Sequence, residues 1–105
     1  MTGQLPVTNL SLFTLIDSGA THSFIASKIA DKLEWKKECL DYPFITVTPA
    51  GDVYKSHNWF KDVLVKIENQ KLFANLVIIE MDDYDVILGM DWLSTHHTLI
   101  DCRRK

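Results

Sequence analysis

The sequence predicts a mainly β protein, a small closed barrel with one or two short helices, and three observations support this. Several short runs of β-branched, aromatic and aliphatic residues are separated by turn-forming residues. Helical spacing of apolar residues is confined to Ser23–Leu33, with one or two further turns suited to Met90–His96. A length of 105 residues, with 47% hydrophobic and 24% charged residues, suits one folded domain. We therefore expect residues 1–105 to form a single domain of six to eight short strands.

The N-terminal half is expected to contain two strands followed by a helix. Leu10–Ile16 begins with alternation and ends continuously apolar, which predicts a strand, and Leu5 and Val7 predict another strand before it. The next regular element is a short amphipathic helix with Ser23 as its cap. Its apolar residues follow the i, i+3, i+4, i+7 spacing: Ala26, Ile29, Ala30 and Leu33.

The C-terminal half predicts a hairpin and several core strands. Residues 44–48 and 53–56 are β-rich and flank a turn at Pro49-Ala50-Gly51-Asp52, whereas Tyr42-Pro43 should interrupt regular structure. The remaining expected strands are Trp59–Ile67, with Val63, Val65 and Ile67 on one face, then Leu72–Ile79, Tyr84–Leu88 and Thr98–Cys102.

Composition and charge argue against several classes of function. The net charge is −3 and the basic residues are scattered, so nothing predicts binding of nucleic acid. No apolar stretch approaches the roughly 20 residues of a membrane span, and no basic segment followed by an apolar block indicates secretion. We therefore expect a cytoplasmic protein whose two cysteines, Cys39 and Cys102, are reduced.

The histidines and cysteines do not predict a metal site. His96 and His97 precede Cys102, while His57 and Cys39 lie elsewhere, and these spacings do not match the tight patterns of metal ligands. We expect solvated or helix-end histidines, and no metal or cofactor.

Leu15-Ile16-Asp17-Ser18-Gly19-Ala20 is the most informative segment. A carboxylate directly after two large aliphatic side chains is either a structural charge or a group whose chemistry needs a shaped, dry site. The small residues that follow allow another backbone to approach closely. By itself, Asp-Ser-Gly is more often the end of a strand, where the Asp caps a turn. A second signal, Val86-Ile87-Leu88-Gly89, ends 72 residues after Asp17 (89 − 17).

Together the two segments resemble the D-[ST]-G-A and hydrophobic-hydrophobic-Gly pair of the retroviral-type aspartic proteases, the retropepsins. The longer segments Asp17–Ile25 and Ile87–Leu93 are similar to the protease of gypsy-type LTR retrotransposon polyproteins, and the likeness covers nearly the whole chain. The resemblance implies a retropepsin fold and an aspartic endopeptidase that cleaves the polyprotein of a retroelement in its cytoplasmic particle. It further implies a homodimer in which Asp17 and its symmetry mate form the catalytic dyad.

The resemblance also implies roles for residues around Asp17. Ser18 should hydrogen-bond to the active-site loop of the other chain, and Gly19 should present its carbonyl to the substrate backbone. The further residues implied in substrate binding are Ala20 and Thr21 of the loop, and Ala50 and Gly51 at the tip of a flap that spans Thr46–Ser56. The residues implied to support the loop from beneath are Ile87, Leu88 and Gly89. An ordinary exposed turn is the alternative interpretation of the flap hairpin.

Three features depart from the pattern of many retropepsins. Thr21 and Met90 stand where an aspartate and a basic residue are common, although gypsy-type relatives often lack both. The sixteen residues before Asp17 are too few for the outer strand that joins the dimer sheet in viral enzymes, so we expect Thr98–Cys102 to supply the interface. The missing outer strand favours the alternative of a non-catalytic dimerisation or peptide-binding module with the same fold, whereas the intact Asp17-Ser18-Gly19 favours the enzyme. A third interpretation, an unrelated small β-barrel, does not explain the paired motifs.

Overall fold

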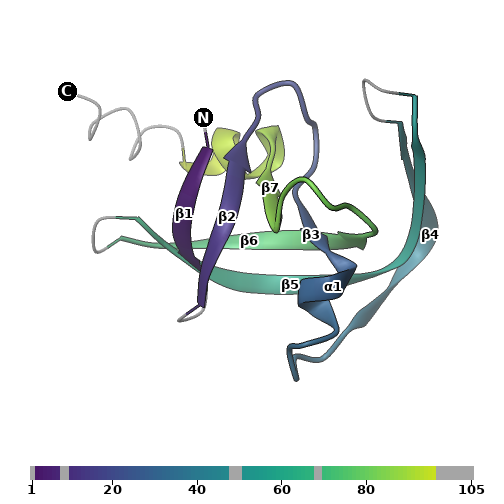
Figure 1. Cartoon of the computed structure of the whole chain (residues 1–105), viewed down its shortest axis with the longest axis horizontal. Helices are drawn as coiled ribbons and strands as arrows, with labels where there is room; N and C mark the ends of the chain where they lie inside the picture. The colour runs from purple at the N-terminus through teal and green to yellow at the C-terminus, as the bar shows by residue number, and fades with distance from the viewer. Residues whose placement is uncertain (1, 8–9, 48–50, 68–69, 97–105) are drawn as a thin grey trace.

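The computed structural model describes residues 2–7, 10–47, 51–67 and 70–96 (Figure 1). Its labelled elements are β1 (Thr2–Val7), β2 (Leu10–Ile16), β3 (Phe24–Ala26), α1 (Ser27–Ala30), β4 (Glu38–Val47), β5 (Val53–Ile67), β6 (Gln70–Ile79) and β7 (Val86–Leu88). A second short helix spans residues 90–96. No helix among these described residues is both long and apolar enough to cross a membrane.

The strands close into a small barrel. They are ordered β1-β2-β7-β3-β6-β5-β4, and an additional pairing of Val7 in β1 with Val65 in β5 joins the two sides of the sheet. Strand β4 lies beyond this ring, beside β5, and forms with it the long hairpin at the right of Figure 1. The predicted mainly β closed barrel with two short helices is therefore confirmed.

Strand β5 is longer than the sequence pattern predicts. Two separate runs were expected, but a single strand covers Val53–Ile67 because β4 pairs along its first part and β6 along its second. A β-bulge between Phe60 and Val63 shifts the register with β6. Asp62 adopts a φ of 56° there, and its N–H donates to Asn75 Oδ1 at 3.0 Å. The extra residue lets Phe60 and Val63, which are 1% and 5% exposed, both face the core.

The predicted helix over Ser23–Leu33 is wrong at its start. Phe24–Ala26 form strand β3, which is parallel to β6 and antiparallel to β7, and helix α1 spans only Ser27–Ala30. The helix cap is Ala26, not Ser23. All three residues of β3 are buried, so pairing with two strands that are distant in sequence outweighs the local helical spacing.

Tyr42-Pro43 does not end the strand, as the sequence predicted, but it does disturb the pairing. Strand β4 continues through both residues, while its register with β5 shifts between Cys39 and Phe44. Pro43 has no N–H to donate, and β4 tolerates it because the strand lies at the end of the sheet order.

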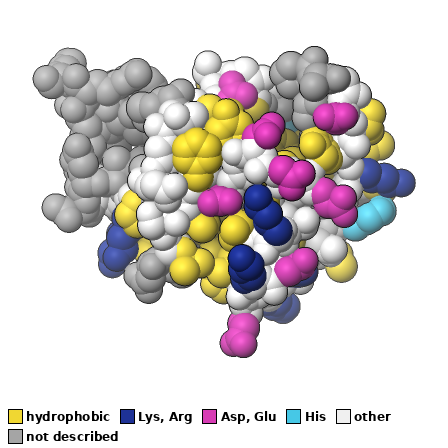
Figure 2. Space-filling model, viewed as in Figure 1, with side chains coloured by type: hydrophobic (Ala, Val, Ile, Leu, Met, Phe, Trp, Pro, Cys, Tyr) yellow, Lys and Arg dark blue, Asp and Glu magenta, His cyan; other side chains and the backbone are white. Residues whose placement is uncertain are grey.

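The buried side chains form two clusters. The first fills the barrel and includes Phe60, Leu76, Leu88 and Trp92. The second lies between the barrel and the β4–β5 hairpin: Phe24, Ala26, Val77, Ile79 and Met81, with Phe44 and Tyr54 packed against them. The second cluster anchors the base of the hairpin to the barrel. On the face shown in Figure 2, acidic side chains are dispersed among basic and apolar ones and do not form a single charged patch.

Candidate active site

Asp17 and Gly89 follow two neighbouring parallel strands. Strand β2 pairs with β7 in the register Thr14–Val86, Leu15–Ile87 and Ile16–Leu88. The Asp17 N–H continues this ladder by donating to the Leu88 carbonyl at 2.9 Å. The two sequence signals, which are 72 residues apart (89 − 17), therefore meet at one end of the barrel.

The Asp17 carboxylate is held by the backbone of its own loop. The Gly19 N–H donates to Asp17 Oδ1 at 2.8 Å, and the Ala20 N–H donates to the Asp17 carbonyl at 3.2 Å. A Cβ on Gly19 would lie 3.1 Å from Asp17 Oδ1, so a small residue suits this turn. Asp17 is partly exposed, and Ser18 and Gly19 are exposed. The loop thus presents an oriented carboxylate to solvent.

Gly89 allows residues 89–91 to lie directly against this loop. A Cβ at Gly89 would lie 2.7 Å from the Ala20 carbonyl oxygen and closer still to that of His22. The Met90 N–H donates to the Ala20 carbonyl at 2.7 Å, and the Asp91 N–H donates to the Thr21 carbonyl at 3.2 Å. A side chain at position 89 would separate these backbones, so the close approach requires glycine.

The other residues expected to support the loop are in β7. Leu88 is 0% exposed and belongs to the barrel core, and Ile87 is partly buried against the second cluster. The position of β7 next to β2 places both residues beside the strand that ends at Asp17.

The hairpin expected to act as a flap is present. Gly51 lies near its tip with a φ of +91°, whereas Ala50 is outside the described residues. The hairpin base contacts the loop after Asp17, because the rings of His22 and Phe44 meet edge-to-face at 4.7 Å. Ile45 and Val53 on the hairpin are 61% and 64% exposed. The hairpin therefore carries exposed apolar side chains on both of its strands.

Two positions depart from the common retropepsin pattern, and the structure places both near the loop. Thr21 is exposed, with its hydroxyl 2.9 Å from His22 Nδ1, and Met90 is 40% exposed. The expected interface strand, Thr98–Cys102, lies outside the described residues.

Sequence reasoning missed Ser23 and Asp91. The hydroxyl of Ser23 is buried, accepts a hydrogen bond from the Gly89 N–H at 3.0 Å and donates to Asp91 Oδ1 at 2.6 Å. The sequence signal was a small polar residue shortly after the Asp-Ser-Gly-Ala segment and an acidic residue two places after Gly89. The helical spacing after Ser23 predicts a helix cap at this position, because strand β3 depends on partners that are distant in sequence.

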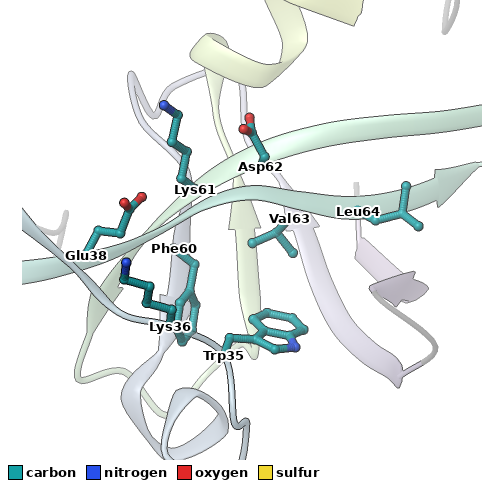
Figure 3. A pocket seen from close by; sticks show the side chains of 8 residues that line it. All are labelled: Trp35, Lys36, Glu38, Phe60, Lys61, Asp62, Val63 and Leu64. Atoms are coloured by element: carbon teal, nitrogen blue, oxygen red, sulfur yellow. The ribbon is translucent and has the colours of Figure 1, made fainter.

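A cavity of about 530 Å³ lies elsewhere, against the bulge of β5. Figure 3 shows the side chains that line it, including Trp35 and Phe60, whose rings meet edge-to-face at 5.1 Å. None of the lining residues belongs to the Asp17 loop or to β7. Over the residues that the structure describes, no group of three His, Cys, Asp or Glu side chains is arranged to hold a metal ion. Cys39 is exposed and free, and Cys102 is outside the described residues.

Comparison with known proteins shows the family. The model of the family described as retroviral aspartyl protease matches residues 1–105. The chain is 32% identical over 89 residues to DNA damage-inducible protein 1 of Candida glabrata, which covers 85% of this chain and 20% of that protein. It therefore spans about a fifth of the length of this curated relative.

Two solved structures show the same fold. EIAV protease, complexed with the inhibitor HBY-793, has a TM-score of 0.70 at 17% identity, covering 92% of this chain and 88% of that one. The retroviral protease-like domain of Ddi1 from Leishmania major has a TM-score of 0.68 at 16% identity, covering 92% and 77%. With the paired Asp17 and Gly89 segments, the fold and the match over residues 1–105 lead to one conclusion. The chain belongs to the family of retroviral-type aspartyl proteases.

Proposed function

We propose that this chain is an aspartic endopeptidase that works as a homodimer, with residues 1–105 forming one protease domain. The observation that carries the proposal is the geometry of Asp17. Its carboxylate accepts a 2.8 Å hydrogen bond from Gly19 N–H and remains partly exposed, on a loop fastened to Leu88, Met90 and Asp91. An oriented, accessible carboxylate is what general base catalysis on water requires.

The proposed dimer follows from the number of catalytic carboxylates. The sequence contains one Asp-Ser-Gly triplet, whereas peptide hydrolysis by this class uses two carboxylates facing one water. A twofold axis beside Asp17 would supply the second carboxylate from an identical chain. Two carboxylates at such a short distance cannot both be ionised and share one proton, for which the aspartic proteases are the standard example. The ionised carboxylate accepts a proton from water, which attacks the scissile carbonyl, and the protonated one donates to the carbonyl oxygen.

The neighbouring residues fit supporting roles in this dimer. Ser18 is exposed at the turn, where its hydroxyl is available to the loop of a second chain. Gly19, Ala20 and Thr21 follow in the same loop, and we assign their backbone to the substrate. The flap, with Ala50 and Gly51 at its tip, would cover an extended peptide and exclude water.

We further propose a retroelement polyprotein as the substrate, processed in the cytoplasmic particle of the element. Support comes from the segments Asp17–Ile25 and Ile87–Leu93, which are similar to gypsy-type polyprotein proteases. A relative carries the name DNA damage-inducible protein 1, so a cellular protein is the alternative substrate class. Peptides from both classes should therefore be compared. A module that binds peptide without cleaving it is the alternative to an enzyme.

Cleavage of an unbiased peptide library, followed by mass spectrometry, tests the proposed activity. We expect Asp17→Asn to fold but to lose at least about 100-fold in rate, because the side chain keeps its shape but no longer provides an ionisable carboxyl. Asp31→Asn is the matched control. Asp31 pairs with Lys37 at 3.3 Å on the surface, with side chains 70% and 42% exposed, so its loss should leave the rate unchanged.

Pepstatin should inhibit the wild type, and a metal chelator should not. Binding of peptides without any cleavage by the folded wild-type dimer would favour the non-catalytic module. Retained cleavage by a well-folded Asp17→Asn protein would refute the aspartic mechanism.

A further inference from the structure

Ser23 stands out as a buried polar residue that joins two segments distant in sequence. It is 0% exposed and lies where the Asp17 loop ends and β3 begins. Its hydroxyl accepts a hydrogen bond from the Gly89 N–H at 3.0 Å and donates one to Asp91 Oδ1 at 2.6 Å. A serine hydroxyl has one donor and two acceptor sites, so both hydrogen bonds can form together. The side chain is therefore a fixed link between the loop and residues 89–91.

Asp91 completes this link from the other side. Its Oδ1 also accepts a hydrogen bond from the Trp92 N–H at 2.8 Å, which orients the carboxylate toward Ser23. The Asp91 N–H donates to the Thr21 carbonyl at 3.2 Å, so side chain and backbone bind the same loop.

The Ser23–Asp91 link fastens the loop that orients the Asp17 carboxylate. Asp17 Oδ1 is held by the N–H of Gly19, and the loop that contains Gly19 is fastened at one end by the Asp17 N–H to Leu88. Its other end is fastened through Ser23. Without the Ser23 hydroxyl, the buried Gly89 N–H would lose its partner, and residues 20–23 could shift relative to β7. Small displacements of this kind are costly to catalysis because the reacting groups must be aligned to within about an ångström.

We propose that Ser23 and Asp91 are positioning residues, which orient Asp17 by clamping its loop to Gly89 without touching the substrate. This inference rests on the proposed function, since it explains how the dyad geometry is maintained.

The test measures kcat and KM separately for Ser23→Ala, Asp91→Ala and Asp91→Asn. Assays use an enzyme concentration above which specific activity no longer rises, with active sites titrated by a tight-binding inhibitor. We expect Ser23→Ala and Asp91→Ala to lower kcat by about 10- to 100-fold, with KM changed by less than about threefold. Asp91→Asn retains an oxygen acceptor for Ser23 and Trp92, so its kcat should remain within about threefold of the wild type. The double alanine variant should be little worse than either single variant, because both remove the same link.

Thr14→Val is the matched control. Thr14 is also buried, at 1% exposure, but its hydroxyl donates only locally, to the Leu12 carbonyl at 3.0 Å. This variant should lose stability without a comparable loss of kcat. Hydrogen exchange provides a readout independent of activity, since the Gly89 amide should exchange faster in Ser23→Ala and not in Thr14→Val.

The outcomes separate the two proposals. Suppose that the wild type is active. The positioning role alone would then be overturned if kcat fell equally in Thr14→Val and Ser23→Ala, or if kcat of Asp91→Asn were as low as that of Asp91→Ala. An unchanged exchange rate of the Gly89 amide in Ser23→Ala would also overturn it. A folded wild-type dimer that cleaves no peptide would defeat the proposed function and, with it, the catalytic purpose of the clamp.

Discussion

Gly89→Ala is a single methyl addition that should both destabilise the protein and impair the site. The new Cβ would lie 2.7 Å from the Ala20 carbonyl oxygen and 2.9 Å from the His22 carbonyl carbon, with the His22 oxygen closer still. Real Cβ atoms essentially never come within 3.0 Å of such neighbours, and here the neighbours are backbone atoms that cannot rotate away. The loop must therefore move away from residues 89–91.

The expected magnitude follows from what that movement disrupts. Overpacking a tight site costs about 1–3 kcal/mol. Separation of the segments also strains the hydrogen bonds from Gly89 N–H to Ser23 Oγ and from Met90 N–H to the Ala20 carbonyl, each worth about 0.5–1.5 kcal/mol. We expect the free energy of unfolding to fall by about 3 kcal/mol. Because Asp17 belongs to the displaced loop, kcat should fall by at least about tenfold in protein that remains folded.

Urea unfolding at one fixed protein concentration measures the decrease in the free energy of unfolding. Gly3→Ala is the matched control. A Cβ at Gly3 would meet nothing within 4 Å, so that variant should differ from the wild type by less than about 0.5 kcal/mol. If Gly89→Ala were as stable as Gly3→Ala and cleaved peptide at the wild-type rate, the close packing of the loop on residue 89 would be refuted.

Four further outcomes are expected. Gly51→Ala should cost about 1–2 kcal/mol, because Gly51 has a φ of +91° that a side chain disfavours; unchanged urea stability would contradict this. The pH–rate profile of peptide cleavage should be bell-shaped with its optimum below neutrality, as for a dyad that shares one proton; a rate that rises steadily with pH and is abolished by a chelator would exclude the dyad. Specific activity should fall as the enzyme is diluted, with a dimer at high concentration by sedimentation; a monomer with constant specific activity at every concentration would exclude a shared active site. Deletion of residues 98–105 should leave a soluble, inactive protein, and retained activity would show that the interface lies elsewhere.

The local pattern of apolar and polar residues was sufficient to predict most of the strands. Leu10–Ile16 was predicted with the bounds that β2 has in the structure, because its alternation and its apolar end reflect one buried face and a buried terminus. A core strand over Tyr84–Leu88 and a hairpin were also predicted, but with other bounds. Strand β7 spans only Val86–Leu88, β4 begins before residue 44, and β5 continues beyond residue 56. The proximity of Asp17 and Gly89 came from the resemblance of both segments to one family, since no spacing rule places residues 72 positions apart in contact.

The remaining features of the fold depend on strands that pair with segments distant in sequence, which a short stretch of sequence does not contain. Phe24–Ala26 have apolar spacing that fits a helix, yet they form a strand because β6 and β7 offer hydrogen bonds on both sides. Ser23 appeared to be a helix cap for the same reason, and only the folded chain places its hydroxyl 3.0 Å from the Gly89 N–H. The sequence by itself determined which residues are apolar, which turns they flank and which carboxylate belongs to the family motif. Tertiary structure alone decided which backbone groups meet, because a strand obtains its hydrogen bonds from segments distant in sequence, and burial makes every unpaired group costly.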